Sequence, residues 1–402
     1  IEDVEVFSIN ADFVRGEGRP YSFSYGFEYT YNNVHSTAFG TTLTKQNNSI
    51  SKINKANSTF KIPTRYPSDG SNYSTAASYY EYRKDLSNKS NFNFGMRYTY
   101  TWLNARWLEE ALIDANLNRI KTQNSSLTGS LGYVYRSNND WQISANFSSG
   151  FRSPNIDDMG KIRENRGLLS VPNQQLKPEY AYNSELGFAK FFNNKRNVFL
   201  VNLYYTHLTD HIIRDYFEIL NDTTTQNPAT ILYNSEEVKT IANINSGRAY
   251  IYGFSFDAEA RILNNLVFKS NITFTKGGSV NSSNPLPSIS PLFGSFYLKW
   301  VGSKFKTQLS YKFSGYKNPE DYSYGGEDGL EETPLLGYNG KEPSYYGMPS
   351  WGIFKLSSSY EVSNNLKATL IFDNIFDIHY REFASGISSP GRNLNIVLEH
   401  KF

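Results

Sequence analysis

The stretch FKTQLSYKF at residues 305–313 decides the fold class, because its apolar and polar side chains alternate at nearly every position. Phe305, Leu309 and Phe313 stand on one side of this alternation, and Lys306 and Lys312 stand on the other. A period of two places the two sets on opposite faces of a β-strand, whereas an amphipathic helix has a period near 3.6. The segment therefore predicts a strand with one apolar and one polar face.

The same alternation recurs at residues 21–30, 141–148 and 393–402. Aromatic and β-branched residues dominate the apolar sides, as expected on a pleated surface that faces lipid. In the last segment His400 interrupts the apolar side and Val397 interrupts the polar one.

The composition is unusual for a soluble protein. Aromatic residues make up 16% of the 402 residues, although only 39% of the chain is hydrophobic. In a transmembrane β-barrel, alternate strand residues face lipid or water and aromatic girdles lie at both interfaces, which explains both properties together. No run of about 18 apolar residues occurs, so a helical membrane span is excluded. We therefore expect an all-β protein, a transmembrane antiparallel β-barrel, with a soluble all-β repeat protein as a weaker alternative.

Two kinds of connection alternate along the chain. Short polar ones lie at 15–19, 87–90, 137–140, 193–196, 263–265, 302–304 and 363–365. Long ones lie near 34–71, 105–122, 154–179, 217–246, 278–290, 317–349 and 378–390. Outer-membrane barrels have short periplasmic turns and long extracellular loops in this order.

This rhythm predicts about 15 strands in one domain that covers residues 1–402. Bacterial single-chain barrels have an even number of strands and begin and end on the periplasmic side. An odd number would start on the extracellular side, so we expect the chain to be the C-terminal part of a larger barrel.

Several function classes are excluded or disfavoured. The 40 basic and 38 acidic side chains lack the basic excess of nucleic-acid-binding proteins. The absence of cysteine excludes a disulfide scaffold, a thiolate zinc site and a cysteine nucleophile. The HExxH, GxSxG and GxxxxGK[ST] motifs are absent, and the adjacent Asp157 and Asp158 would face opposite ways on a strand. We expect no enzymatic activity and no bound cofactor.

Two segments carry a family resemblance. SSGFRSPNIDDMGK (148–161) and VPNQQLKPEYAYNSELG (171–187) resemble the paired FRAP and NPNL boxes of TonB-dependent outer-membrane receptors, most closely the type found in Bacteroidetes. The end of the chain is similar to the last hairpin of this family at Asn374, Phe376, Asp377, Tyr380 and residues 390–392. Members of the family have a plug followed by a barrel of 22 strands. The resemblance implies that this chain is the last part of such a barrel, with the plug and the first strands missing.

The resemblance also implies a function. It predicts a receptor in the cell outer membrane that imports a scarce, bulky nutrient with energy from the TonB complex, which would act through the missing N-terminal part. An iron chelate (siderophore) is the first expectation, and cobalamin or haem comes second. A passive porin or an adhesin-like barrel stays open as an alternative from another class. The expected partners are outer-membrane lipid and a bulky metal chelate, and whether a surface lipoprotein binds the loops stays open.

Arg152 is a candidate ligand-binding residue because it lies where a strand enters a long loop. Its planar, permanently charged guanidinium suits an anionic ligand. It could equally pair with Asp157, Asp158 or Glu179, and we favour this structural interpretation because Pro154 and Pro178 indicate rigid loop supports.

Loop 317–349 supplies the other ligand-binding candidates. It places four tyrosines among acidic residues: Tyr322, Tyr324, Tyr345 and Tyr346. Aromatic rings with a polar tip suit a bulky ligand such as a metal chelate. For any single tyrosine, an aromatic belt above the membrane is an equal alternative.

Histidine provides little support for a metal site. Haem receptors that resemble this type commonly use a histidine between the two boxes, and none is present here. His35 could substitute, as could His207 or His211. On a strand, His207 and His211 would lie about 13 Å apart, too far for one ion, so we expect no metal site. Finally, Phe402 at the chain end resembles the terminal aromatic that signals barrel assembly, with an ordinary girdle residue as the alternative.

Overall fold

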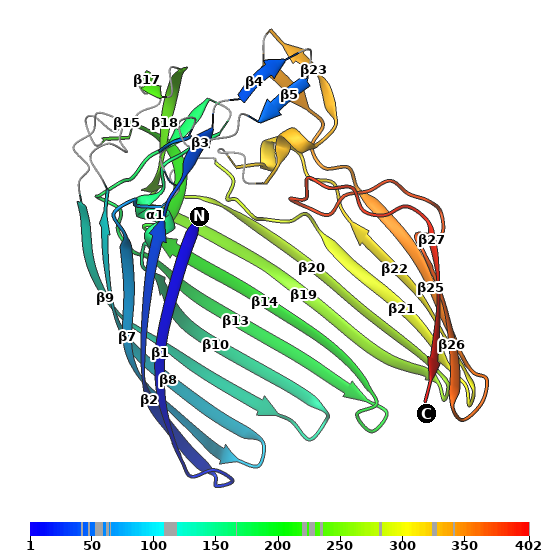
Figure 1. Cartoon of the computed structure of the whole chain (residues 1–402). Helices are drawn as coiled ribbons and strands as arrows, with labels where there is room; N and C mark the ends of the chain where they lie inside the picture. Colours follow the sequence, from blue (N-terminus) through cyan, green and yellow to red (C-terminus); the bar gives the residue numbers. More distant parts are fainter. Residues whose placement is uncertain are drawn as a thin grey trace.

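The computed structural model describes residues 1–41, 43–46, 49–52, 59–61, 64, 66–107, 119–165, 167–218, 223–224, 230–233, 236–280, 284–323, 328–340 and 342–401. Fifteen antiparallel strands form one continuous, strongly curved sheet (Figure 1). Their order in the sheet follows their order in the chain. The strands are β1 (Glu2–Arg15), β2 (Tyr21–Ser36), β7 (Ser71–Ser87), β8 (Ser90–Arg106), β9 (Arg119–Arg136), β10 (Trp141–Arg152), β13 (Glu179–Phe192), β14 (Asn197–Thr209), β19 (Arg248–Leu263), β20 (Leu266–Ser279), β21 (Phe293–Val301), β22 (Phe305–Ser314), β25 (Trp351–Glu361), β26 (Leu366–Asp373) and β27 (Asn393–His400). The predicted all-β class and the predicted 15 strands are confirmed.

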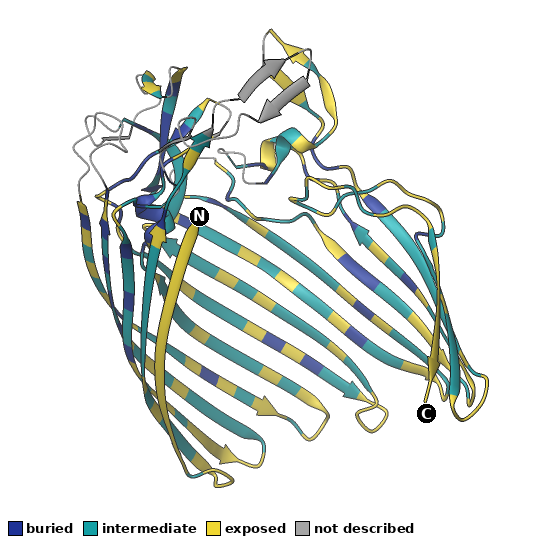
Figure 2. Ribbon diagram, viewed as in Figure 1, coloured by how far each residue is buried: buried dark blue, intermediate teal, exposed yellow. Residues whose placement is uncertain are grey.

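The outer face of this wall is apolar, as the two-residue period predicts. In β22, Leu309 pairs with Leu298 of β21 and Leu356 of β25, so the same face continues from strand to strand. Leu394 and Ile396 of β27 are 58% and 69% exposed, which places them outside any protein interior. Figure 2 shows the exposed residues as bands that alternate along the strands.

The inner face is polar and rich in ion pairs between neighbouring strands. Such pairs join Lys306 to Glu361 at 3.2 Å, Lys355 to Asp373 at 2.9 Å, Lys367 to Glu399 at 3.0 Å and Lys269 to Glu259 at 2.8 Å. A wall of this kind has one hydrated and one lipid-compatible side. None of the described helices has the length and apolar content that a membrane crossing requires.

Short turns lie at one end of the wall and long loops at the other, as predicted (Figure 1). At the loop end, the described residues of 153–178 and 210–247 fold into a small cap. It contains α1 (Ile156–Gly160), β11 (Arg163–Asn165), β12 (Leu168–Ser170), β15 (Ile212–Glu218), β16 (Thr223–Thr224), β17 (Thr230–Tyr233) and β18 (Glu236–Asn245). The sequence analysis predicted that the long connection after β14 begins near residue 217. This start is wrong, because β14 ends at Thr209 and residues 212–218 form β15 within the connection.

The cap packs against the loop ends of β8 and β9 through one hydrophobic core. Met159 and Leu169 are fully buried, and they belong to one cluster with Trp107, Phe217 and Val238. Other loops carry short hairpins and 3-10 turns: β3 (Phe39–Thr41) with β6 (Thr59–Lys61), β4 (Leu43–Gln46) with β5 (Ser49–Lys52), β23 (Leu335–Asn339) with β24 (Glu342–Tyr345), η2 (Pro319–Asp321) and η3 (Leu330–Glu332). The described parts of the loops therefore form organised structure that can present side chains at fixed positions.

Candidate ligand-binding site

Arg152 lies at the base of the cap, at the end of β10. Its guanidinium donates a hydrogen bond to the buried Asp158 carboxylate and lies 3.9 Å from the Glu179 carboxylate. Asn243 of β18 donates to the same Asp158 oxygen at 3.1 Å. The predicted pairing of Arg152 with carboxylates of its own loop is confirmed, and the Asn243 contact joins this network to the second loop of the cap.

Asp158 is held in place by the start of α1. The Asp158 N–H donates to Asn155 Oδ1 at 3.0 Å, and the Asn155 N–H donates to Asp158 Oδ2 at 3.1 Å, which is a capping box. Asp157 instead pairs with Lys161 at 3.5 Å. These two acids therefore lie on a helix, and the strand geometry that the sequence argument assumed for them is wrong.

The second sequence box completes the cap. The Asn173 side chain donates to the Asn243 carbonyl at 2.9 Å. The Lys177 N–H donates to Asn245 Oδ1 at 2.8 Å, and the Asn245 amide donates back to the Lys177 carbonyl at 3.0 Å. Residues of both boxes thus bind the first loop of the cap to the second, which gives these residues a structural role.

His211 is buried beside this network. Burial lowers the pKa of His211, although the nearby Glu179 carboxylate acts in the opposite direction. The Ile212 N–H donates to Glu179 Oε2 at 2.6 Å, which fixes that carboxylate next to the histidine. Within the described part of the chain, no three His, Cys, Asp or Glu residues gather where a metal ion could bind.

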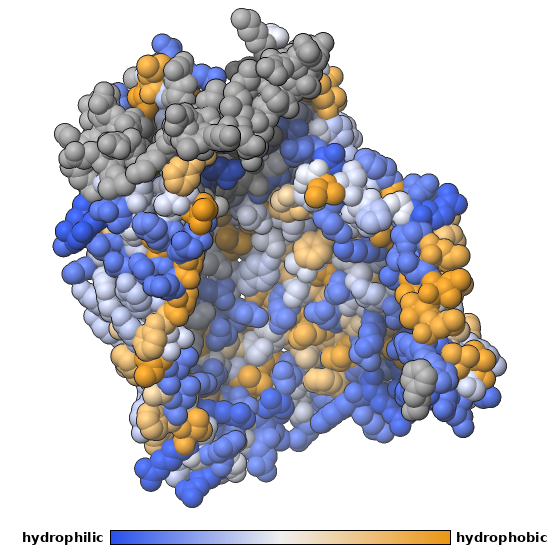
Figure 3. Space-filling model, viewed as in Figure 1, coloured by the Kyte–Doolittle hydropathy of each residue, from blue (hydrophilic) through white to orange (hydrophobic). Residues whose placement is uncertain are grey.

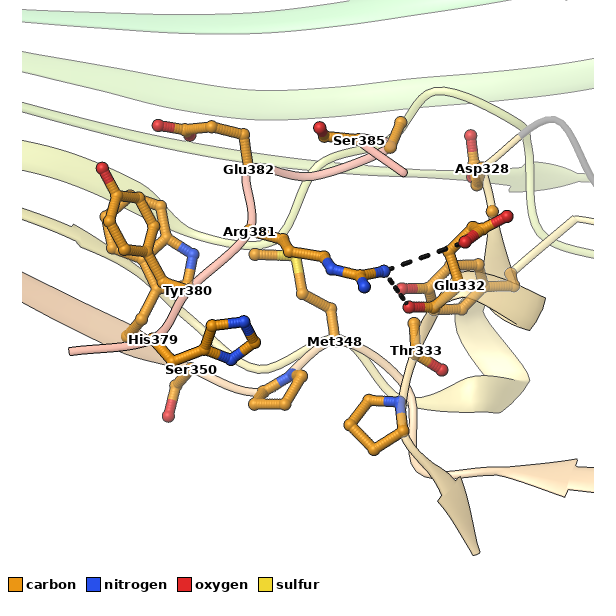
Figure 4. A pocket seen from close by; sticks show the side chains of 16 residues that line it. Asp328, Glu332, Thr333, Met348, Ser350, His379, Tyr380, Arg381, Glu382 and Ser385 are labelled. Carbon is orange, nitrogen blue, oxygen red and sulfur yellow. Dashed lines mark hydrogen bonds and ion pairs between the residues drawn. The ribbon is translucent and has the colours of Figure 1, made fainter. Parts of the chain in front are cut away.

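A cavity of about 240 Å³ lies at the loop end of β25, between residues 322–351 and 379–385 (Figure 4). Trp351 forms part of its wall and lies on the inner face, because its neighbour Gly352 pairs with Phe313 on the outer face. The Trp351 and Tyr380 rings are 4.4 Å apart. Lys312, also on the inner face, pairs with Glu382 at 2.7 Å. The loop after β26 therefore folds over the inner side of the wall.

Arg381 crosses from this loop to η3 (Figure 4). Its guanidinium donates to the Glu332 carbonyl at 2.5 Å and lies 3.8 Å from the Glu332 carboxylate. His379 forms a hydrogen bond of 2.9 Å with Ser388. The cavity therefore presents a guanidinium, an imidazole, carboxylates and aromatic rings within one small volume, a set that suits a polar ligand with a flat apolar part.

A buried ion pair supports the cavity from one side. Lys317 lies 3.6 Å from Asp328, and its ammonium is 5.0 Å from the Tyr322 ring centre and 4.6 Å from that of Phe383. Burial lowers the pKa of Lys317. Burial and the Asp328 carboxylate raise the pKa of Tyr322 to about 12, so its hydroxyl stays protonated at neutral pH.

Asn374 and Asp377, in the C-terminal segment that resembles the family, hold the opposite side of the cavity in place. The Ile378 N–H donates to Asn374 Oδ1 at 2.9 Å, and the Asn374 amide donates to the Ile378 carbonyl at 2.8 Å. The Arg392 N–H donates to Asp377 Oδ1 at 2.7 Å, and this contact lowers the pKa of Asp377. These bonds close the base of the loop that presents residues 379–382 to the cavity.

The structure separates the residues that the sequence grouped as ligand-binding candidates. Tyr322 lines the cavity, whereas Tyr346 packs on Tyr316 with ring centres 5.2 Å apart and Tyr345 lies in β24. His35 is exposed on the outer face of β2. Tyr324 and Phe402 lie outside the described residues.

Sequence reasoning missed the second half of the cavity. Trp351, Tyr380 and Arg381 were not among the candidates, although Tyr380 was noted for its family resemblance. The sequence did contain one signal for this part of the cavity, because Lys312 and Trp351 fall on the inward-facing side of their strands next to a long loop.

Comparisons with known proteins agree with this geometry. Residues 5–375 match the family described as TonB dependent receptor-like, beta-barrel. No curated protein sequence matches the chain significantly. Among solved structures, the chain is similar to the copper transporter OprC, with a TM-score of 0.73, 15% identity and coverage of 100% of this chain and 57% of that one.

Two further similar structures are receptors. The ferric yersiniabactin uptake receptor FyuA from Yersinia pestis has a TM-score of 0.61 and 14% identity, and the chain covers 55% of it. The siderophore receptor PirA from Acinetobacter baumannii has a TM-score of 0.69 and 14% identity, with 55% covered. Both matches cover 100% of this chain, which thus spans little more than half the length of these structures.

The resemblance to the Bacteroidetes type stays a prediction. The strand order, the two-faced wall and the match over residues 5–375 together establish the family. The chain belongs to the TonB-dependent receptors of the outer membrane, and it forms part of their β-barrel.

Proposed function

We propose that this chain forms the wall and part of the ligand-capturing mouth of an importer for a bulky metal chelate, with an iron chelate (siderophore) as the first candidate. The observation that carries this proposal is the cavity on the inner side of the wall at its extracellular end. Loops that fold inward there lie on the path of a ligand that enters the barrel. Energy would come from the TonB complex.

The size of the cavity indicates how much of the ligand it takes. Pockets for drug-sized ligands have volumes of about 300–1,000 Å³. The cavity, at about 240 Å³, is smaller. We infer that it receives one arm or ring of the chelate, against the Tyr380 and Trp351 rings, while Arg381 binds an anionic oxygen.

The structure gives less support to haem as the ligand. The segment between the two boxes has no histidine, and its helix and strands are packed into the cap. One similar structure, HasR of Serratia marcescens, is described in complex with its hemophore and heme, so haem remains a second candidate. Cobalamin stays a second candidate as an expectation from the sequence. The absence of enzymatic activity also stays a prediction.

The proposal is tested by growth on single nutrient sources. A strain that depends on this protein is supplied with individual ferric siderophores, haem, cobalamin or copper, with and without a functional TonB complex. We expect rescue by a ferric chelate that is lost without TonB. Equal uptake in both strains would support the passive porin and contradict the proposal.

Site variants then locate the ligand. Arg381→Ala should lower chelate affinity by about tenfold, which corresponds to ~1.4 kcal/mol. Arg248→Ala is the matched control, because Arg248 is exposed at the loop end of β19 and does not line the cavity. Equal chelate affinity of both variants would show that the cavity does not bind the ligand.

A further inference from the structure

The short turns of the wall carry an excess of positive charge. They contain the basic residues Arg19, Lys89, Lys195, Arg196 and Lys304 and the acidic residues Glu17 and Asp140. Figure 3 shows hydrophilic residues gathered along this end. Since the short turns of outer-membrane barrels are periplasmic, these cations lie at the periplasmic leaflet.

The cations of the inner wall and those of the turns differ in their partners. Inward lysines such as Lys306, Lys355 and Lys367 each pair with an acidic residue of a neighbouring strand. Lys195 and Arg196, in the turn between β13 and β14, are exposed and have no acidic partner among the described residues. These two cations are therefore available to an anionic group from outside the described chain.

Lys190 shows where the membrane surface lies. It is on the lipid-facing side of β13, and its ammonium is 5.1 Å from the Trp141 ring centre and 5.5 Å from that of Phe192. The same ammonium donates to the Asn139 carbonyl in the adjacent turn. A lysine that bends toward the turn beside aromatic rings keeps its charge at the level of the lipid head groups.

We propose that Lys190, Lys195 and Arg196 form a surface that binds the phosphate groups of anionic phospholipids in the periplasmic leaflet. Lys190 and the rings beside it set the depth, and the two turn cations lie just beyond them. An acidic periplasmic protein is disfavoured as the partner, because Lys190 lies on the lipid-facing side among aromatic rings.

The test uses the intact protein in nanodiscs that contain phosphatidylethanolamine and a minor fraction of phosphatidylglycerol. Native mass spectrometry measures the ratio of the two lipids that remain bound. We expect enrichment of phosphatidylglycerol over the bulk ratio. The double variant Lys195→Gln, Arg196→Gln should reduce this enrichment about fivefold for each charge removed, the factor that corresponds to ~1 kcal/mol per basic residue at an anionic surface.

The control variant is Lys306→Gln, Glu361→Gln, which removes a paired cation from the inner wall and keeps the net charge unchanged. Its lipid ratio should equal that of the unchanged protein. Added salt should weaken the enrichment in the unchanged protein, because exposed charges are screened. A bound ratio equal to the bulk ratio, or the same ratio in the turn variant and the control, would overturn the proposal.

Discussion

Arg152 illustrates how a charged residue in a ligand-receptor motif can have an architectural role. Its guanidinium is about half exposed, while its partner Asp158 is only 6% exposed in its side chain. A buried carboxylate needs compensating donors, and Arg152, Asn243 and the Asn155 N–H supply them. The residue therefore contributes to the stability of the cap.

Replacing Asp158 should loosen the cap. Asp158→Ala removes the acceptor of these donors, and we expect a loss of about 1–3 kcal/mol of local stability. Asp157→Ala is the matched control, because the Asp157 side chain is 40% exposed, against 6% for Asp158, so its loss should cost clearly less stability than that of Asp158. Hydrogen exchange of residues 155–162 and 236–245 measures the difference. Similar exchange in both variants would contradict this role of Asp158.

His211 should make the cap sensitive to acid. Because burial lowers its pKa, the folded cap binds fewer protons than the unfolded cap once the pH falls below the ordinary histidine value of about 6.5. The stability that His211 contributes is present above that pH and is lost as the pH falls through the folded-state pKa. The hydrogen-exchange protection factors of residues 210–218 should therefore decrease as the pH falls below about 6.5. In His211→Gln this decrease should be absent, and its persistence would assign the effect to another group.

At the scale of single elements, the strands follow directly from the sequence. The period of two in residues 305–313 is a local property, and the register of β22 with β21 and β25 repeats it on both sides. Turn residues such as Asn193 and Asn194 have positive φ values of 48° and 53°, which asparagine tolerates. Strands and turns could thus be predicted because their causes lie within a few residues.

The cap and the cavity could not be predicted in this way. In the cap, Leu168 of β12 pairs in parallel with Lys239 of β18, far along the chain. In the cavity, Arg381 meets Glu332 across two different loops. Pairings between distant segments leave no periodic signal, so tyrosines near one another in sequence, such as Tyr322 and Tyr346, separate in the structure.

A pair of arginine substitutions distinguishes the two faces of β22. Leu309→Arg places a charge near the middle of the lipid-facing side and should cost about 2–4 kcal/mol of folding stability. Gln308→Arg places the same side chain on the hydrated inner face, so its effect should be much smaller. Urea unfolding from lipid vesicles, monitored by tryptophan fluorescence, gives both values. Equal losses would show that the two faces do not differ in environment.

At the scale of the whole molecule, the cap and the cavity lie at the same end of the wall, where the long loops are. The wall separates lipid from a polar interior, and the inward loops at its extracellular end place Arg381 and Tyr380 beside that interior. The cap joins the loops after β10 and β14 at the same end, through the pairing of β12 with β18. That residues 1–402 act as a single domain stays a prediction.

The chain has no cysteine, so a single fluorophore can report on the cavity. Ser350→Cys places the label at the cavity lining, and Ser303→Cys places it in a periplasmic turn as the control. Paramagnetic ferric chelates quench a fluorophore at short range. We predict saturable quenching at position 350 by the chelate that supports growth, and none at position 303. Quenching that is absent at 350, or equal at both positions, would contradict ligand capture at this cavity.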